Sequence, residues 1–305
     1  MEKKQNPLFF TGSSHAALAQ EIVAELGIPL GRISLNQFPD GETGVEILED
    51  VRGRTVYVLQ STGLNPNFYL VELLIMIDAL KRSSAKEIIA IIPYYGYCRQ
   101  DRKDKPGMPI TAKLIANMLS ASGVSRLITF DLHAGQLEGF FEIPVDHLHC
   151  QALLAKEALM AFKNQPFVVV APDLGSVKIV EKMAKMTSSD VVVIEKQRIN
   201  TLDIKMRLIG SVASKNVLIV DDICSTAGTL CAAAELCKQN NAKEIVAVVT
   251  HGICTGNAIQ KIEDSPLTSL ILTNSVPIFE RFKAAIKITT VSLAPLIAKM
   301  ISQEK

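Results

Sequence analysis

Short, uninterrupted apolar segments recur along the chain and alternate with longer amphipathic stretches. The clearest are 56–60, 87–93, 126–131, 167–172, 191–195, 216–221, 244–250 and 269–273. Runs without polar alternation are typical of strands that are covered on both faces, as in parallel sheets flanked by helices. Between two of these runs, residues 66–82 place Leu70, Leu73 and Ile77 on one helical stripe. The pattern predicts an α/β fold.

Length and an internal repeat both indicate two domains. At roughly 150 residues per domain, the 305 residues correspond to about two. In each half a threonine opens a helical stretch that leads to a strand and then to a histidine. The spacing from Thr111 to His133 equals the spacing from Thr229 to His251. A repeat of this kind is typical of two similar units.

We therefore expect two similar domains, residues 1–146 and 147–305, each with a mainly parallel sheet flanked by helices. The segment 285–305 is expected to pack on the first domain. In such domains small ligands bind at the carboxyl ends of the strands.

Composition disfavours several classes of protein. Lys plus Arg number 32 and Asp plus Glu 31, and the resulting net charge of +1 does not suit a binder of duplex nucleic acid or of anionic membranes. The apolar runs are too short for a membrane span, and the N-terminus lacks a signal-peptide pattern. Six cysteines without a CxxC pair suit reduced thiols. We expect a cytoplasmic protein that binds neither nucleic acid nor membrane.

The sequence NVLIVDDICSTAGTL at 216–230 has the pattern of a phosphate-binding loop. Small residues let backbone N–H groups approach an anion, and the first turn of a helix offers unpaired N–H donors. Two adjacent acids suit sugar hydroxyls instead, so the pattern predicts a phosphorylated sugar. An ordinary capped helix after a strand is the alternative. The candidate residues are Asp221, Asp222, Ser225, Thr226, Ala227, Gly228 and Thr229.

This loop resembles the signature of phosphoribosyl diphosphate-binding proteins, which include phosphoribosyltransferases and ribose-phosphate diphosphokinases. From about residue 8 to the C-terminus, other segments resemble the ribose-phosphate diphosphokinase (phosphoribosyl pyrophosphate synthase) family in particular. They are FPDGE at 38–42, PYYGYCRQDRK at 93–103, PITAK at 109–113, DLHAGQLEGFFEIPVD at 131–146 and THG at 250–252. The resemblance implies two phosphoribosyltransferase-like domains and an enzyme of nucleotide biosynthesis.

The implied reaction transfers the diphosphate of ATP to the C1 hydroxyl of ribose 5-phosphate and yields phosphoribosyl diphosphate and AMP. The resemblance also implies a homo-oligomer, commonly dimers assembled into a hexamer. The sugar phosphate would bind the loop at 221–229.

The resemblance assigns ATP binding to two segments. They are Arg99, Gln100 and Asp101 in one, and Phe38, Asp40 and Glu42 in the other. The basic side chains near the first suit a polyphosphate. The second would complete the adenine site of a neighbouring subunit, with an aromatic ring stacking and two carboxylates accepting the exocyclic amine. From the residues alone, Pro-Asp-Gly is equally a tight turn.

Metal binding and catalysis are implied for four residues. The resemblance makes His133 and Asp173 the metal-site positions and Mg²⁺ the cofactor, with a second ion conceivable near the two acids of the sugar loop. Mg²⁺ prefers oxygen ligands and keeps several waters. His133, Lys196 and Arg198 are the implied catalytic residues. Lys196 and Arg198 would lie on a loop that closes over the β-phosphate and neutralises its charge.

Four departures from the family pattern are visible. Ser225 stands where the pattern DDxxDTAGT has a third acid, so metal or sugar affinity is expected to differ. Lys178 replaces a common arginine, and Pro39 replaces a frequent serine in a turn. Residues 103–107 differ from an arginine-rich run that contributes to regulation by ADP and phosphate, so such control is in question. None of these removes a core catalytic position.

Three other interpretations stay open. A non-catalytic regulatory paralogue would be expected to have damaged catalytic loops. A plain phosphoribosyltransferase would have no use for the segments 38–42 and 93–103. A zinc site is conceivable because His147 and His149 would share one face of a strand; a surface segment between domains is the alternative.

Overall fold

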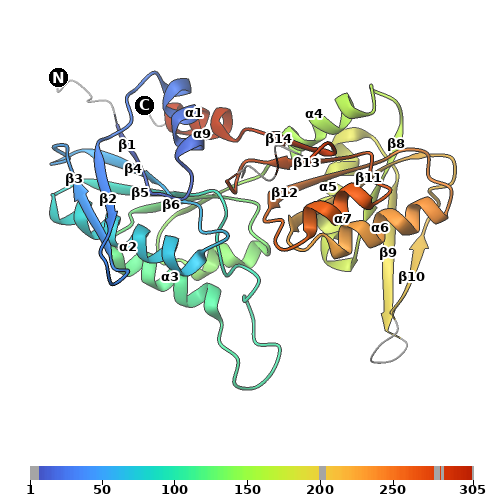
Figure 1. The fold of residues 1–305 in the computed structure, drawn as a ribbon, viewed down its shortest axis with the longest axis horizontal. Helices are drawn as coiled ribbons and strands as arrows, with labels where there is room; N and C mark the ends of the chain where they lie inside the picture. The colour runs from blue at the N-terminus through green and yellow to red at the C-terminus, as the bar shows by residue number, and fades with distance from the viewer. Residues whose placement is uncertain (1–6, 199–203, 278–281, 283–284, 304–305) are drawn as a thin grey trace. The chain divides into compact units, whose positions relative to one another are not determined.

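The chain divides into two compact units, shown as a ribbon in Figure 1. The computed structural model describes residues 7–198, 204–277, 282 and 285–303, without the side chains of 196–205. Unit 1 comprises Met1–Leu148, Ser275–Pro277 and Ser292–Lys305. Unit 2 comprises His149–Asn274 and Ile278–Val291. The α/β class expected from the apolar runs is confirmed.

Unit 1 is built on a five-stranded sheet in the order β1-β4-β5-β6-β7, with every neighbouring pair parallel. The strands are β1 (Leu8–Thr11), β4 (Thr55–Leu59), β5 (Glu87–Ile92), β6 (Arg126–Phe130) and β7 (Val145–Leu148). The helices are α1 (Ala16–Leu26), α2 (Pro66–Arg82), α3 (Thr111–Ser122) and α9 (Ala294–Gln303). Helices α2 and α3 cover one face of the sheet, and α1 and α9 the other (Figure 1).

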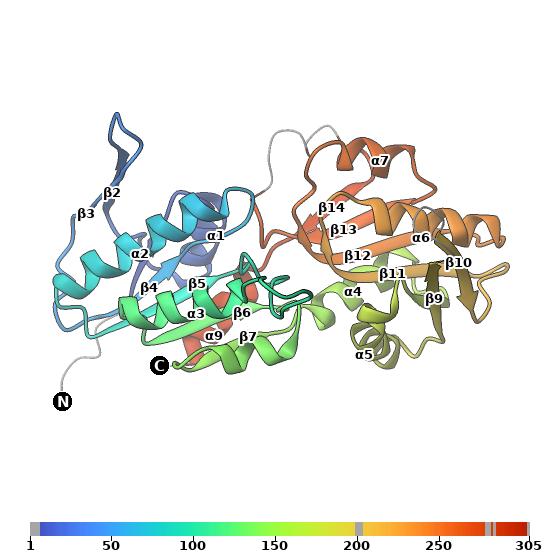
Figure 2. The same ribbon diagram turned by 90° about the horizontal axis from the view of Figure 1, so that it is seen from below.

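Unit 2 is built on a seven-stranded sheet in the order β10-β9-β8-β11-β12-β13-β14. The strands are β8 (Phe167–Ala171), β9 (Val191–Arg198), β10 (Ile204–Ile209), β11 (Asn216–Cys224), β12 (Ile245–Gly252), β13 (Ser269–Thr273) and β14 (Ile288–Val291). The helices are α4 (Gln151–Ala161), α5 (Val177–Thr187), α6 (Gly228–Gln239) and α7 (Ala258–Asp264). Figure 2 shows α6 and α7 on one face and α4 and α5 on the other. Every residue of β8 and of β12 is buried, as expected for strands covered on both faces.

Local sequence explains several helix boundaries. Helix α2 begins at Pro66, where the missing backbone N–H removes no helical hydrogen bond, and it spans the 66–82 expected from the sequence. Its stripe of Leu70, Leu73 and Ile77 is buried. Helix α3 ends before Gly123, whose φ of 116° is accessible without strain to glycine.

Two hairpins break the parallel pattern and were not predicted. β9 continues past the expected end of its apolar run and pairs antiparallel with β10. In unit 1, β2 (Ile33–Gln37) and β3 (Thr43–Ile47) form a separate two-stranded antiparallel sheet. These strands are half-buried or exposed, so their sequences lack the continuous apolar run that marks the central strands.

The C-terminal segment returns to unit 1, while residues 278–291 belong to unit 2. Helix α9 packs against α1, and its Ile297 and Ile301 are buried. The Ser292 hydroxyl donates a hydrogen bond to the Glu21 carboxylate of α1. Helix α9 therefore stabilises the unit that holds the first strand.

A buried polar network fixes the loop after β1. Glu72, which is 2% exposed, accepts hydrogen bonds from the Ser13 N–H at 2.7 Å and from Gln60 Nε2 at 2.7 Å. Gln60 Oε1 accepts from the Ser14 N–H at 3.1 Å. A Cβ atom on Gly12 would lie 2.4 Å from Gln60 Oε1. Because the Gln60 amide is held by these partners, glycine is required here for close approach.

Gly12→Ala is expected to destabilise the protein by about 2 kcal/mol, because the new methyl group must displace a buried, fully bonded amide. Urea unfolding of the full chain measures this difference. Gly139→Ala is the control, since a Cβ there meets nothing within 4 Å. Equal free energies of unfolding for the two variants would show that the Gln60 side chain can move aside without destabilising the protein.

In the part of the chain that the structure describes, no helix is long and apolar enough to cross a membrane.

Candidate active site

The expected sugar-phosphate loop follows the central strand of the sheet in unit 2. β11 lies between β8 and β12, and it continues through Asp221 and Asp222 as far as Cys224. The strand is therefore three residues longer than the apolar run at 216–221 indicates. β12 still offers a pairing partner there, with Cys224 opposite Gly252.

Backbone hydrogen bonds hold the start of the sugar-phosphate loop, and its end leads into the first turn of α6. The Cys254 N–H donates to the Cys224 carbonyl at 3.0 Å, and the Thr255 N–H donates to the Ser225 carbonyl at 2.8 Å. Ala227 then takes a left-handed conformation, with φ of 60°, and α6 begins at the next residue. The first turn of α6 therefore presents the backbone N–H groups that a helix leaves without helical partners.

Three carboxylates interact at neighbouring strand ends of unit 2. Asp173 follows β8, and its Oδ1 accepts hydrogen bonds from the N–H groups of Gly175 at 3.0 Å and Ser176 at 3.3 Å. Burial, and then the charges of Asp222 and Asp173, raise the pKa of Asp221 to about 8. A cation would relieve this repulsion, and carboxylate oxygens are the ligands that Mg²⁺ prefers. The residues of this site therefore fit a magnesium ion.

The raised pKa predicts a pH-dependent stability. The folded state holds a proton on Asp221 that the unfolded chain releases at its ordinary value of 3.8, so stability is lost as pH rises from about 4 to about 8. Asp221→Asn removes this loss. We expect the stability of Asp221→Asn relative to wild type to grow by about 3 to 4 kcal/mol from about pH 5 to about pH 8.

Chemical unfolding in EDTA across this pH range measures the effect. Asp190→Asn is the matched control, because the Asp190 carboxylate is 80% exposed. Parallel stability curves for wild type and Asp221→Asn would contradict the raised pKa.

In unit 1, the segment after β5 is anchored by buried residues. The Gly96 N–H donates to Thr62 Oγ1 at 2.7 Å, and a Cβ on Gly96 would lie 2.5 Å from the Thr62 carbonyl oxygen. The Tyr95 hydroxyl donates to the Ala112 carbonyl at 2.9 Å. Arg99 follows this anchored stretch and is exposed at the edge of the sheet where the parallel strands end.

The side chains of Gln100 and Asp101, which follow Arg99, accept hydrogen bonds from other segments of unit 1. Thr111 Oγ1 donates to Gln100 Oε1 at 2.5 Å, at the first residue of α3. Gln136 Nε2 donates to Asp101 Oδ2 at 3.2 Å. Sequence reasoning missed Gln136 as a partner, although it lies inside the quoted 131–146 segment. The expected ATP segment is thus linked to the segment that carries His133.

His133 lies in the loop after β6, the strand beside β5. The Asp131 N–H donates to the Leu148 carbonyl at 3.0 Å, and Asp131 has a positive φ of 30°. His133 is exposed. The structure therefore brings Arg99 and His133 to the same edge of one sheet, as the topology of parallel strands requires.

The segment Phe38–Glu42 is the turn of the β2–β3 hairpin, as its Pro-Asp-Gly sequence predicts. The Phe38 N–H donates to the Glu42 carbonyl at 2.8 Å, and the Glu42 N–H donates to Asp40 Oδ1 at 3.2 Å. The Phe38 ring is 51% exposed, which leaves it available for a ligand or a second chain.

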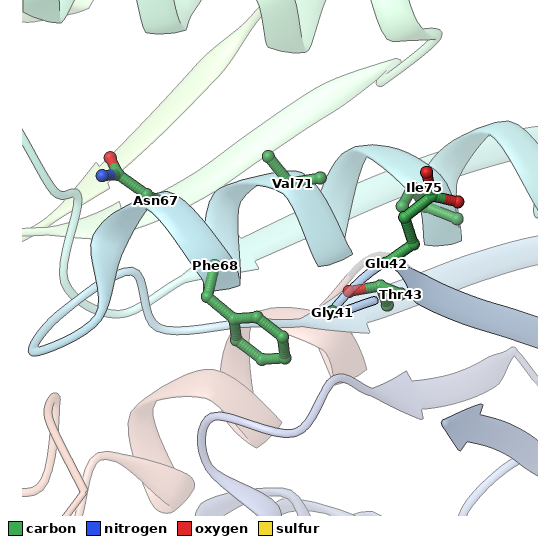
Figure 3. Close-up of a pocket in the computed structure, with 7 residues that line it drawn as sticks. All are labelled: Gly41, Glu42, Thr43, Asn67, Phe68, Val71 and Ile75. Atoms are coloured by element: carbon green, nitrogen blue, oxygen red, sulfur yellow. The ribbon is translucent and has the colours of Figure 1, made fainter. Parts of the chain in front are cut away.

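A cavity of about 320 Å³ lies between this hairpin and α2 (Figure 3). Its lining residues are Gly41, Glu42, Thr43, Asn67, Phe68, Val71 and Ile75. The cavity belongs to unit 1 alone, and Glu42 is the expected site residue that it contains.

Lys196 and Arg198 lie on the backbone of β9, paired with Met206 and Ile204 of β10. We expected a loop at these two positions, but both lie in a strand of the β9–β10 hairpin. Their side chains lie outside the described part of the structure, as do residues 199–203.

His147 does not present a nitrogen to a metal, which counts against the zinc interpretation. Its Nε2 accepts a hydrogen bond from the Leu132 N–H at 2.8 Å. Its Nδ1 lies 2.6 Å from Glu138 Oε1. Although Asp131, His147 and His149 bring possible ligand atoms within 4.8 Å of one another, the His147 ring is held by hydrogen bonds within the protein.

Comparisons with known proteins agree with the fold. Residues 8–123 match the N-terminal domain of ribose phosphate pyrophosphokinase, and residues 171–304 match the phosphoribosyl synthetase-associated domain. A ribose-phosphate pyrophosphokinase of Helicobacter pylori is 41% identical over 96% of this chain and 91% of the relative. One of Burkholderia pseudomallei is 44% identical over 99% of this chain and 96% of the relative.

A solved structure also covers nearly the whole chain. The phosphoribosylpyrophosphate synthetase of Mycobacterium smegmatis superposes with a TM-score of 0.94 at 37% identity, over 98% of this chain and 99% of that one. The fold and site thus define a phosphoribosyltransferase-like α/β transferase. Within that class, the chain belongs to the ribose-phosphate pyrophosphokinase family.

Proposed function

We propose that this chain transfers the diphosphate of ATP to the C1 hydroxyl of ribose 5-phosphate, forming phosphoribosyl diphosphate and AMP. The observation that carries the proposal is the carboxyl edge of unit 2, where two acids are followed by an anchored loop and the N-terminus of α6. The family relationship over nearly the full chain supports the same reaction.

The sugar phosphate binds this edge in two parts. Carboxylates accept hydrogen bonds from vicinal hydroxyls, so Asp221 and Asp222 hold the ribose ring. The phosphate lies at the backbone N–H groups of residues 225–229, where the helix dipole favours an anion. Ser225 and Thr229 add hydroxyl donors.

ATP binds the exposed edge of unit 1. Arg99 suits polyphosphate through its planar, always-charged guanidinium. Gln100 and Asp101 hold the segment in place through α3 and Gln136, so their contribution is to orient Arg99. His133 lies at the same sheet edge and contacts the phosphates or their metal.

Asp173 and the two acids of the sugar loop would hold Mg²⁺ in unit 2. When bound, the ion supplies charge neutralisation at the phosphates. The same carboxylates orient the sugar, and their mutual repulsion makes a cation favourable there.

The chemical step is an in-line displacement at the β-phosphorus. The C1 oxygen of the sugar forms a bond to the β-phosphorus while the bond from that phosphorus to the α–β bridging oxygen breaks. The hydroxyl proton is lost to solvent, and AMP leaves with the bridging oxygen. Lys196 and Arg198 neutralise the charge that develops on the transferred group.

A second copy of the chain completes the adenine site. The exposed Phe38 stacks on the base of the neighbouring subunit, and Asp40 and Glu42 accept its amine. This proposal makes the active form a homo-oligomer, with dimers assembled into a hexamer. None of the six cysteines, all of which lie in the described part of the chain, forms a disulfide, which suits a cytoplasmic enzyme.

Sugar-dependent formation of AMP tests the function. Purified chain with ATP, ribose 5-phosphate and Mg²⁺ is expected to release AMP and phosphoribosyl diphosphate, and Lys196→Ala is expected to lower kcat by about 100-fold or more. Lys215→Ala is the control: Lys215 pairs with Asp190 at 3.6 Å, away from the carboxyl ends of the strands.

An absence of sugar-dependent AMP would contradict the enzyme and favour the regulatory paralogue. In that case Ser225→Asp restores the family's third acid. AMP formation by this variant would show that Ser225 alone had inactivated the site. Conversion of a free nucleobase and phosphoribosyl diphosphate to a nucleotide, with release of pyrophosphate, would instead indicate a phosphoribosyltransferase.

A further inference from the structure

We infer that His147 is a positioning residue that holds His133 in its working geometry. The inference rests on the proposed role of His133 and adds a residue that contacts neither substrate. It is carried by two hydrogen bonds of one imidazole, which fasten both ends of the segment that contains His133.

The strand register places His147 for this task. In the parallel pairing of β6 with β7, His147 lies opposite Thr129, near the end of β6. From there its Nε2 reaches the backbone N–H of Leu132 at 2.8 Å, the residue directly before His133. The His147 side chain is 7% exposed, so water competes little for this bond.

The second bond determines which nitrogen carries the hydrogen. Nδ1 lies 2.6 Å from Glu138 Oε1, and an ionised carboxylate only accepts. Nδ1 therefore donates to Glu138, and Nε2 keeps the lone pair that accepts from Leu132. Glu138 lies in the short 3₁₀ helix η1 (Gly135–Phe140), so the ring connects the start of the loop to its end.

Backbone strain explains why this loop needs such a fastening. Asp131 has a φ of 30°, a left-handed region in which a residue with a side chain is strained. A strained backbone conformation persists where surrounding contacts hold it in place. The hydrogen bond from the Leu132 N–H to His147 is such a contact, because Leu132 directly follows Asp131. Within the same segment Gln136 donates to Asp101, so a displaced loop would also disturb the ATP segment.

Steady-state kinetics of the full chain test the inference, with each variant assayed well below its melting temperature. His147→Ala is expected to lower kcat by about 10- to 100-fold, the usual effect of losing a residue that orients another. The KM for ribose 5-phosphate is expected to stay unchanged, because the sugar loop lies in unit 2. His147→Gln, whose amide oxygen can accept from the Leu132 N–H, is expected to recover most of kcat.

A double-mutant cycle with His133→Ala makes the test specific. If His147 acts through His133, then His147→Ala adds little further loss of kcat once His133 is gone. Glu138→Gln is expected to lower kcat less than His147→Ala. Glu142→Gln is its matched control, because that exposed acid pairs with Lys113 on the surface at 3.2 Å.

Three results would overturn the positioning role: an unchanged kcat in His147→Ala, fully additive losses in the cycle, or no recovery by glutamine. Full activity of His133→Ala would overturn it as well, but by refuting the assignment of His133. The first three results leave the proposed function standing, so the two failures are distinguishable.

Discussion

Parallel pairing is the constraint on which the rest of the structure depends. When strands run the same way, their carboxyl ends meet at one edge, and so do the loops that follow them. In unit 1 this places Arg99, after β5, at the same edge of the sheet as His133, after β6. In unit 2 it places Asp173, after β8, beside the acids of β11. Each group of site residues is thus assembled from distant parts of the sequence by one topological rule.

Buried polar contacts then turn these loops into ordered sites. Thr62 holds the segment before Arg99, the Cys254 N–H holds the start of the sugar loop, and His147 holds the loop of His133. Each contact comes from a neighbouring strand or its loop, rather than from the loop itself. A site that is oriented before substrate arrives loses less entropy on binding.

The sequence predicts the elements that depend on local pattern. The run at 66–82 and the continuous apolar runs correspond to α2 and the central strands, because periodicity alone marks them. The end of β11 and the β9–β10 hairpin were missed, since pairing with a neighbour decides where a strand stops. The sequence indicates His147 only as a possible zinc ligand, because its hydrogen bond with the Leu132 N–H depends on the register of β7 against β6. The roles of Lys196 and Arg198 stay predictions.

We propose that ribose 5-phosphate binds unit 2 and that ATP binds unit 1. Hydrogen exchange of the full chain with each ligand alone tests it most directly. Ribose 5-phosphate alone is expected to protect amides at 225–229, and a non-hydrolysable ATP analogue with Mg²⁺ to protect 99–101 and 131–136. Protection of the sugar loop by the ATP analogue, with no effect of ribose 5-phosphate there, would contradict the account.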